Sequence, residues 1–228
     1  MNNIDFKLRY QPIWDMSCNT IMGYEATVCG RQGESAPALF KRHAKQIADF
    51  DGQLIRQAIS EGSTLLQGKQ LLFINIHPKT LTRGLKLTDF PIDHDRIVFE
   101  ITEKTAFTDN VQGELERLQH LGFKLAIDDY GKQYSNLDRL INSWFEPTYL
   151  KLDRSFSAAL RHVDIAKTVI AYTHKLCDKL GKTLIAEGVE TAEQQQVLEG
   201  IGVRFLQGFY LGYPAFADAW RLDMGGVS

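Results

Sequence analysis

The sequence predicts an α/β protein built as a modified (βα)8 barrel of the TIM type, with an antiparallel first strand. Three observations lead to this prediction: short β-rich runs alternate with stretches of helical period, a hairpin opens the chain, and polar side chains end the apolar runs. The 228 residues suit one barrel, because such barrels commonly occupy about 200–250 residues. The runs are evenly spaced without a linker, so we expect residues 1–228 to form a single domain.

The composition is that of a folded protein with almost no net charge. The chain carries 26 Lys and Arg against 28 Asp and Glu, a net charge of −2, and 44% of its residues are hydrophobic. We expect no nucleic-acid polymer as ligand, because such binders carry a clustered basic excess. No run approaches the roughly 18 apolar residues of a membrane span, and no signal-peptide pattern opens the chain. We therefore expect a cytoplasmic protein without membrane contact.

The opening segment predicts a β-hairpin. LRYQPIW at 8–14 and TIMGYEATV at 20–28 are rich in strand-forming residues, and DMSCN between them has the length of a hairpin loop. We therefore expect the first strand to run antiparallel to the second.

The remaining strands are expected at six short apolar runs. These are LLFINI (71–76), RIVFEI (96–101), FKLAID (123–128), TYLKL (148–152), TLIAE (183–187) and VRFLQ (203–207). Apolar residues of helical period predict helices between them, at 53–66, 111–121, 164–180 and 192–198. This alternation is typical of parallel strands joined by helices, and it completes a set of eight strands.

Side chains that can bind a metal or transfer a proton stand at the carboxyl ends of the expected strands. They are Glu25, Asn75, Glu100, Asp128, Asp129, Lys151, Glu187 and Gln207. In a (βα)8 barrel these ends meet at one mouth, which is where active sites lie. Any one of them fits a capping or salt-bridge role, but several carboxylates buried together require compensating cations. The pattern therefore predicts a metal-containing site.

The ligand types indicate which metal the site takes. Glu25, Asn75, Glu100 and Asp128 offer only oxygen atoms as metal ligands, and no His or Cys ends a strand. Such a set favours Mg²⁺ or Mn²⁺ over zinc. Asp128, Asp129 and Glu187 are suited to a second ion about 3.5–4 Å away, as in phosphoester chemistry. Lys151 either faces the attacking water or phosphate, or forms a neutralising salt bridge with Asp128 or Asp153.

Seven segments carry a more specific signal. They are YEATV, INIHP, FEITE, IDDYG, LKLDRSF, IAEGVET and QGFYLGYP, and they extend over nearly the whole chain, from about Leu8 to Pro214. Their order and spacing resemble the EAL domains, the bacterial cyclic di-GMP phosphodiesterases. The resemblance implies the modified barrel fold and the hydrolysis of one phosphodiester bond of cyclic di-GMP, which gives linear pGpG.

The resemblance also implies the metal ligands. The first metal would be bound by Glu25, Asn75, Glu100 and Asp128, and the second by Asp128, Asp129 and Glu187. Both ions would be Mg²⁺ or Mn²⁺, and Ca²⁺ would inhibit because it prefers longer bonds and more ligands.

Further roles follow from the same resemblance. Glu187 would be the general base, and Lys151 would orient the attacking water. Glu103 would anchor the loop after Asp129, and that loop would lie at a homodimer contact. Substrate binding would involve Thr27, Asp153 and Gln207.

Two departures from the family signature weaken these expectations. The signature Glu-x-Leu-x-Arg is here Glu25-Ala26-Thr27-Val28-Cys29, so the phosphate-binding arginine is missing, and Arg31 is the nearest substitute. In the loop after Asp129, Lys132-Gln133 replaces a Thr-Gly pair. A second hypothesis is therefore a weak or inactive domain that regulates by binding cyclic di-GMP or a regulatory protein partner.

Overall fold

The computed structural model describes residues 5–86, 93–102, 105–131, 145–160 and 164–223. In these residues eight strands close into one barrel in the order β1 to β8. Strand β1 (Phe6–Asp15) is antiparallel to both of its neighbours, β2 (Thr20–Gly30) and β8 (Phe205–Leu206), and the other adjacent pairs are parallel. The predicted fold class and the antiparallel first strand are confirmed.

The five central strands lie close to the predicted runs. They are β3 (Leu71–Asn75), β4 (Ile97–Thr102), β5 (Lys124–Tyr130), β6 (Tyr149–Leu152) and β7 (Thr183–Ala186). Side chains of Phe73, Val98 and Ile185 fill the barrel interior below the mouth. The polar residues at the strand ends therefore rest on a packed apolar floor.

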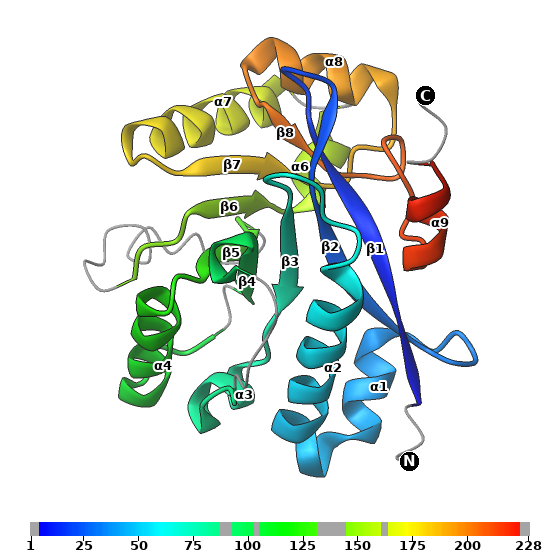
Figure 1. The fold of residues 1–228 in the computed structure, drawn as a ribbon. Coiled ribbons are helices and arrows are strands. Elements are labelled where there is room, and N and C mark those ends of the chain that lie inside the picture. The colour runs from blue at the N-terminus through cyan, green and yellow to red at the C-terminus, as the bar shows by residue number, and fades with distance from the viewer. Residues whose placement is uncertain (1–4, 87–92, 103–104, 132–144, 161–163, 224–228) are drawn as a thin grey trace.

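Helices surround the strands on the outside (Figure 1). The longer ones are α2 (Ile47–Gly62), α4 (Asp109–His120), α7 (Asp164–Lys179) and α8 (Ala192–Ile201). They correspond to the four predicted helices, although α2 begins six residues earlier than expected. The shorter helices, which the sequence did not predict, are α1 (Ala36–Arg42), α3 (Pro78–Arg83), α6 (Arg154–Ala159) and α9 (Ala217–Asp223). Their six or seven residues are too few to show a clear helical period.

Helix α2 ends before the predicted Leu66. Its last residue is Gly62, and a Cβ at that position would lie 2.7 Å from a methyl carbon of Leu72. The helix therefore approaches β3 closely at its end, and residues 63–65 leave it through turns closed by hydrogen bonds to Ile59, Glu61 and Gly62.

Candidate active site

An irregularity in β5 brings two adjacent carboxylates to the barrel mouth. Neighbouring residues of a regular strand point to opposite faces. The pairing of β5 with β6 shifts between Ile127 and Tyr130, and Asp129 has a φ of 56° in the left-handed region. This conformation is costly for a residue with a side chain, and such strain clusters at functional sites. Both Asp128 and Asp129 line a cavity at the mouth.

Lys151 lies at the centre of the carboxylates. Its Nζ atom is 2.6 Å from Glu100 Oε1, 2.7 Å from Glu187 Oε1 and 2.8 Å from Glu25 Oε2. Asp128 Oδ1 is more distant, at 3.8 Å. Four strands and the loop after β7 thus direct one ammonium and four carboxylates to one point, with only 1% of the lysine side chain exposed.

The cluster changes the pKa of each of its members. Burial opposes the charge of Lys151, but the four surrounding carboxylates outweigh burial and raise its pKa well above the ordinary value. Burial raises the pKa of Glu100 well above its usual range, with a further contribution from the charge of Glu25. Burial likewise raises the pKa of Glu187 to about 8. Burial also opposes the charge of Glu25, but the charge of Lys151 and the hydrogen bonds from Lys151, Gln207 and Asn75 together outweigh it and lower the pKa.

Amide side chains connect the carboxylates. Asn75 Nδ2 donates to Glu100 Oε2 at 2.8 Å and to Glu25 Oε1 at 3.3 Å. Gln207 Nε2 donates to Glu25 Oε2 at 2.7 Å and to Gln11 Oε1 at 3.3 Å. Gln11 is the residue directly opposite Glu25 in the hairpin. Glu25 is therefore oriented from three sides, by the lysine and two amides.

Two glycines permit the backbone around Glu187 to pack closely. Gly188 has a φ of 69°, and a Cβ there would lie 2.3 Å from the Cβ of Arg154. A Cβ on Gly208 would lie 2.0 Å from the Val189 carbonyl oxygen. Only glycine fits these positions. This explains the glycines in the IAEGVET and QGFYLGYP segments and places Glu187 beside Gln207.

The mouth contains two adjoining cavities. One of about 210 Å³, which we call the acidic chamber, is lined by Glu25, Asp128, Arg154, Glu187 and Gln207 among others. The other, of about 680 Å³, is lined largely by apolar side chains that include Ala26, Phe40, Leu54 and Ile74, and we call it the apolar chamber. Asp128 lines both. The acidic chamber suits a phosphate with its cations, and the apolar chamber suits a flat ring system.

Asp51 is a buried carboxylate of the apolar chamber. Its Oδ2 atom accepts hydrogen bonds from the His77 amide at 2.9 Å and from the Thr80 hydroxyl at 2.6 Å. Burial raises its pKa to about 6. The ring of His77 stacks on Phe40, with centroids 5.5 Å apart, so that Asp51 and the two rings form one polar and aromatic wall.

The divergent signature residues lie on the hairpin. Thr27 lines the apolar chamber and donates a hydrogen bond from its hydroxyl to the Arg9 carbonyl. Cys29 is half-buried and carries a free thiol. Arg31, the nearest substitute for the missing arginine, lines a separate cavity beside Phe6 and Lys7. Arg154 is the cation that lines the acidic chamber.

The described structure does not bring the predicted substrate-binding residue Asp153 into the mouth. Asp153 is almost fully buried and caps α6, where its Oδ1 atom accepts a hydrogen bond from the Ser155 amide at 2.9 Å. Its substrate role stays a prediction. Glu103 and the pair Lys132-Gln133 lie outside the described residues.

Sequence reasoning overlooked Gln11 and Asp51. Gln11 was within a predicted strand, and its pairing with Glu25 became visible only through the hairpin register. Asp51 carries a signal that the sequence does contain. It falls in the same helical stripe as Phe50, Leu54 and Ala58, which face the core, and a carboxylate within an apolar stripe is unusual.

The donor set fits a hard divalent cation. The carboxylates offer oxygen only, and the ammonium of Lys151 stands at the point on which they converge. Among the described residues, Gln207 Oε1 is buried without a hydrogen-bond partner, so acceptor capacity remains. As the side chains stand, no three His, Cys, Asp or Glu residues in the described part of the chain are arranged around a metal position. In the present arrangement the ammonium of Lys151 neutralises the carboxylates.

Comparison with known proteins identifies the family. The family sequence model of the EAL domain matches residues 1–214 of the chain. The chain belongs to the EAL domain family. RocR of Pseudomonas aeruginosa, named a cyclic di-GMP phosphodiesterase, is 35% identical over 94% of this EAL chain and 58% of its own length. PdeN of Escherichia coli, named a probable cyclic di-GMP phosphodiesterase, is 31% identical over 93% of this chain and 44% of its own length.

A solved structure has the same fold. BlrP1 of Klebsiella pneumoniae, in complex with manganese and cyclic di-GMP, superposes with a TM-score of 0.84 at 27% identity. The match covers 95% of this chain and 57% of BlrP1. This EAL chain spans about half the length of the curated relatives it matches. No helix within the described residues has the length and apolarity needed to cross a membrane.

Proposed function

We propose that this EAL chain hydrolyses one phosphodiester bond of cyclic di-GMP and releases linear pGpG. One observation carries the proposal: Lys151 lies within 4 Å of four carboxylates at the barrel mouth, which marks a site built to hold positive charge. The names of RocR and PdeN and the ligand of BlrP1 support the same activity. The alternative, an inactive regulatory domain, rests only on the signature departures and is not favoured.

The two chambers match the two parts of the substrate. A guanine presents a flat ring with N–H donors at one edge, and the apolar chamber offers Phe40 and His77 as rings and Asp51 as an acceptor. The adjoining acidic chamber receives the phosphate, where Arg154 supplies a cation. Asp128 lies at the junction of the chambers, beside the bond that is cleaved.

Proton transfer is assigned to Glu187. Burial raises the pKa of this carboxylate to about 8, so its ionised form is a stronger proton acceptor than an ordinary glutamate. Lys151 donates a hydrogen bond to Glu25 and balances the charge of the cluster. Gln207 holds Glu25 in place from the other side. The water proton passes to Glu187 as the water oxygen bonds to phosphorus, and the bond between phosphorus and the 3′-oxygen breaks. The 3′-oxygen takes up a proton and leaves as a hydroxyl, while the phosphate, with the water oxygen, stays on the 5′-carbon.

Two Mg²⁺ or Mn²⁺ ions complete the proposed site. Glu25, Asn75, Glu100 and Asp128 would hold the first, and Asp128, Asp129 and Glu187 the second. Such ions polarise the phosphoryl group and lower the pKa of water when bound. Manganese and calcium complexes of BlrP1 with cyclic di-GMP support the use of divalent ions in the family. We expect Ca²⁺ to inhibit turnover, because its longer bonds do not suit a compact pair of sites.

We expect a cytoplasmic protein that forms one domain and assembles as a homodimer. A regulatory protein partner is compatible with hydrolysis and does not replace it.

Incubation of the purified chain with cyclic di-GMP tests the proposal. We expect pGpG, detected by chromatography, with Mg²⁺ or Mn²⁺, and none with Ca²⁺ alone. Excess EDTA should abolish the product, and added Mn²⁺ should restore it. Intact cyclic di-GMP in the presence of both activating ions would overturn the proposed function, and equal rates with all three ions would overturn the metal assignment.

A further inference from the structure

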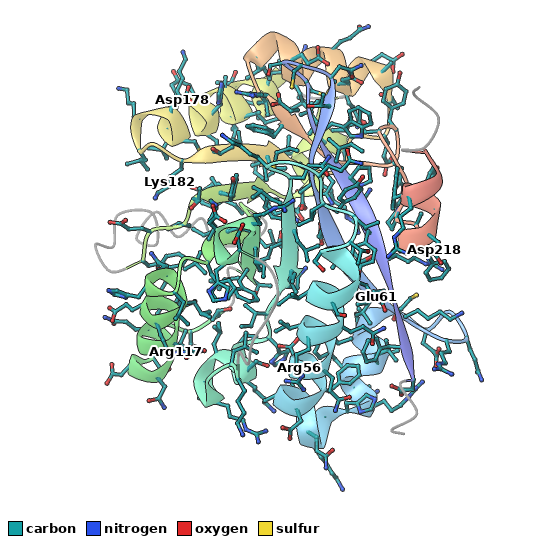
Figure 2. All side chains as sticks on the ribbon, in the orientation of Figure 1. Arg56, Glu61, Arg117, Asp178, Lys182 and Asp218 are labelled. Carbon is teal, nitrogen blue, oxygen red and sulfur yellow. The ribbon has the colours of Figure 1, made fainter. Side chains whose placement is uncertain are left out.

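A third cavity lies between β1, α2 and α9. Its volume is about 960 Å³, and we call it the outer groove. Phe6, Leu8 and Phe216 line it together with the cations Lys7 and Arg31. Figure 1 shows β1 running between α2 and α9, and Figure 2 labels Glu61 and Asp218, which these two helices contribute. The groove shares only Leu8 with the apolar chamber and no residue with the acidic chamber.

One edge of β1 has free backbone groups along this groove. Tyr10 directs its amide and carbonyl to that edge, where both bond to Ala215 at 2.7 and 3.1 Å. Residues two apart on a strand direct their backbone groups to the same edge, so those of Phe6 and Leu8 also point there. In the described part of the chain, β8 pairs with β1 only at Trp14 and Asp15, and no bond reaches this edge at Phe6 or Leu8.

The edge already accepts a strand-like partner at one position. Ala215 forms an isolated antiparallel bridge with Tyr10, and the chain then turns into α9 at Ala217. Pairing therefore stops where the outer groove begins. Two amides and two carbonyls continue the same hydrogen-bonding pattern along it, as an added strand would need.

The groove has an excess of positive charge. Lys7 and Arg9 share one face of β1, and their cationic groups lie 5.5 and 5.4 Å from the centroid of the Phe216 ring. Neither these two nor Arg31 has a carboxylate partner among the described residues. Two carboxylates also line the groove: Asp218 pairs with Arg221 of the same lining at 2.7 Å, and Glu61 accepts from Gln57 at 2.6 Å. The lining cations Lys7, Arg31 and Arg221 therefore outnumber the lining carboxylates.

We propose that the outer groove binds an extended acidic segment of a partner protein, which adds as a strand to the free edge of β1. Side chains of a strand alternate between its two faces. The added segment would place acidic residues beside Lys7 and Arg9 and apolar residues on the face shared by Phe6 and Leu8. Cations on an edge strand repel basic segments and discourage self-pairing, so they select for such a partner.

Binding of a designed peptide tests the inference. The probe is a fluorescent hexapeptide, Glu-Leu-Glu-Val-Glu-Leu, followed by anisotropy with the full chain. Its controls are the same residues in blocks, Glu-Glu-Glu-Leu-Val-Leu, and the alternating peptide N-methylated at every second amide, which removes the donors needed for pairing. We expect saturable binding of the alternating peptide, roughly tenfold tighter than either control. Hydrogen exchange at the amides of Phe6 and Leu8 should slow only with the alternating peptide.

Charge reversal on the protein provides the second arm. Lys7→Glu with Arg9→Glu should weaken binding roughly tenfold, whereas Lys175→Glu with Lys179→Glu on α7 should not. Circular dichroism checks that both variants fold, and the N-methylated peptide tests the inference without altering the protein. The proposal would be overturned if the alternating peptide did not bind, or if the control peptides bound equally well. It would also be overturned if reversal at Lys7 and Arg9 left the affinity unchanged, or if a labelled thymidine hexanucleotide bound equally well.

Discussion

Glu25 in the acidic chamber and Asp51 in the apolar chamber are two buried carboxylates held in opposite ways. In the acidic chamber Glu25 lies against Lys151, and the pKa of Glu25 is lowered despite its burial. In the apolar chamber Asp51 is bonded only to a hydroxyl and an amide, and burial raises its pKa to about 6. A buried carboxylate thus keeps its charge readily only beside a cation. The acidic chamber is a cation site by its construction, and the apolar chamber is a site for neutral donors.

The largest effect is expected on the chemistry of the acidic chamber. Glu187→Gln should reduce kcat roughly 10²- to 10⁴-fold, since it removes the proton acceptor with little change in shape. Binding of cyclic di-GMP, measured by calorimetry, should persist. Glu199→Gln on the exposed side of α8 is the matched control and should retain activity. A loss of affinity as large as the loss of rate would refute the assignment of Glu187 as base.

Removing the central cation should reveal how much the chamber depends on positive charge. Lys151→Met leaves the carboxylates without their ammonium and should cost about 3–5 kcal/mol of unfolding free energy in EDTA. Saturating Mn²⁺ should recover most of that loss, because a divalent ion can replace the ammonium. The exposed Lys175→Met on α7 should change neither value. Chemical denaturation with and without Mn²⁺ measures both, and an equal loss under the two conditions would argue against a shared cation position.

A smaller effect, on substrate binding, is expected where the hairpin residues Thr27 and Cys29 differ from the family signature. Thr27→Leu with Cys29→Arg restores the family signature and should tighten cyclic di-GMP binding by about 1.5–3 kcal/mol, or roughly 10- to 150-fold. Calorimetry in Ca²⁺, which we expect to prevent turnover, measures the affinity. Unchanged affinity would show that another cation, such as Arg154, already fills the role of the missing arginine.

The apolar chamber should contribute a separate pH dependence of stability. The pKa of Asp51 is raised from 3.8 to about 6, so its contribution to stability is complete below pH 3.8 and is lost as the pH rises through 6. Between pH 4.5 and 6 this loss amounts to about 1.5 kcal/mol. The Asp51→Asn variant should lack this loss. The difference in unfolding free energy between the variant and the parent protein should therefore change by that amount over this pH range. Parallel curves would contradict the raised pKa.

Much of the site could be predicted because it depends on strand ends. A parallel strand gathers its terminal side chains at one mouth, so the positions of Glu25, Asn75 and Glu100 followed from the apolar runs before them. Side-chain alternation alone would have separated Asp128 from Asp129, and the irregular pairing of β5 places both at the mouth.

The apolar chamber was harder to predict, because its walls come from segments with no common sequence signal. Phe40 and Asp51 lie on helices α1 and α2, and only the packing of these helices against β2 and β3 brings them beside His77. Short helices such as α1 carry too few residues for a recognisable period. The acidic chamber is thus encoded locally at strand ends, whereas the apolar chamber depends on tertiary contacts.

The central claim is that the acidic chamber directs a water molecule to one phosphate of cyclic di-GMP. Hydrolysis in ¹⁸O-labelled water with Mn²⁺, followed by mass spectrometry of the product, tests it most directly. We predict linear pGpG with one ¹⁸O atom in its 5′-phosphate, and no product from Glu187→Gln over the same period. Unlabelled product, or cyclic di-GMP that remains intact with Mn²⁺, would contradict the account.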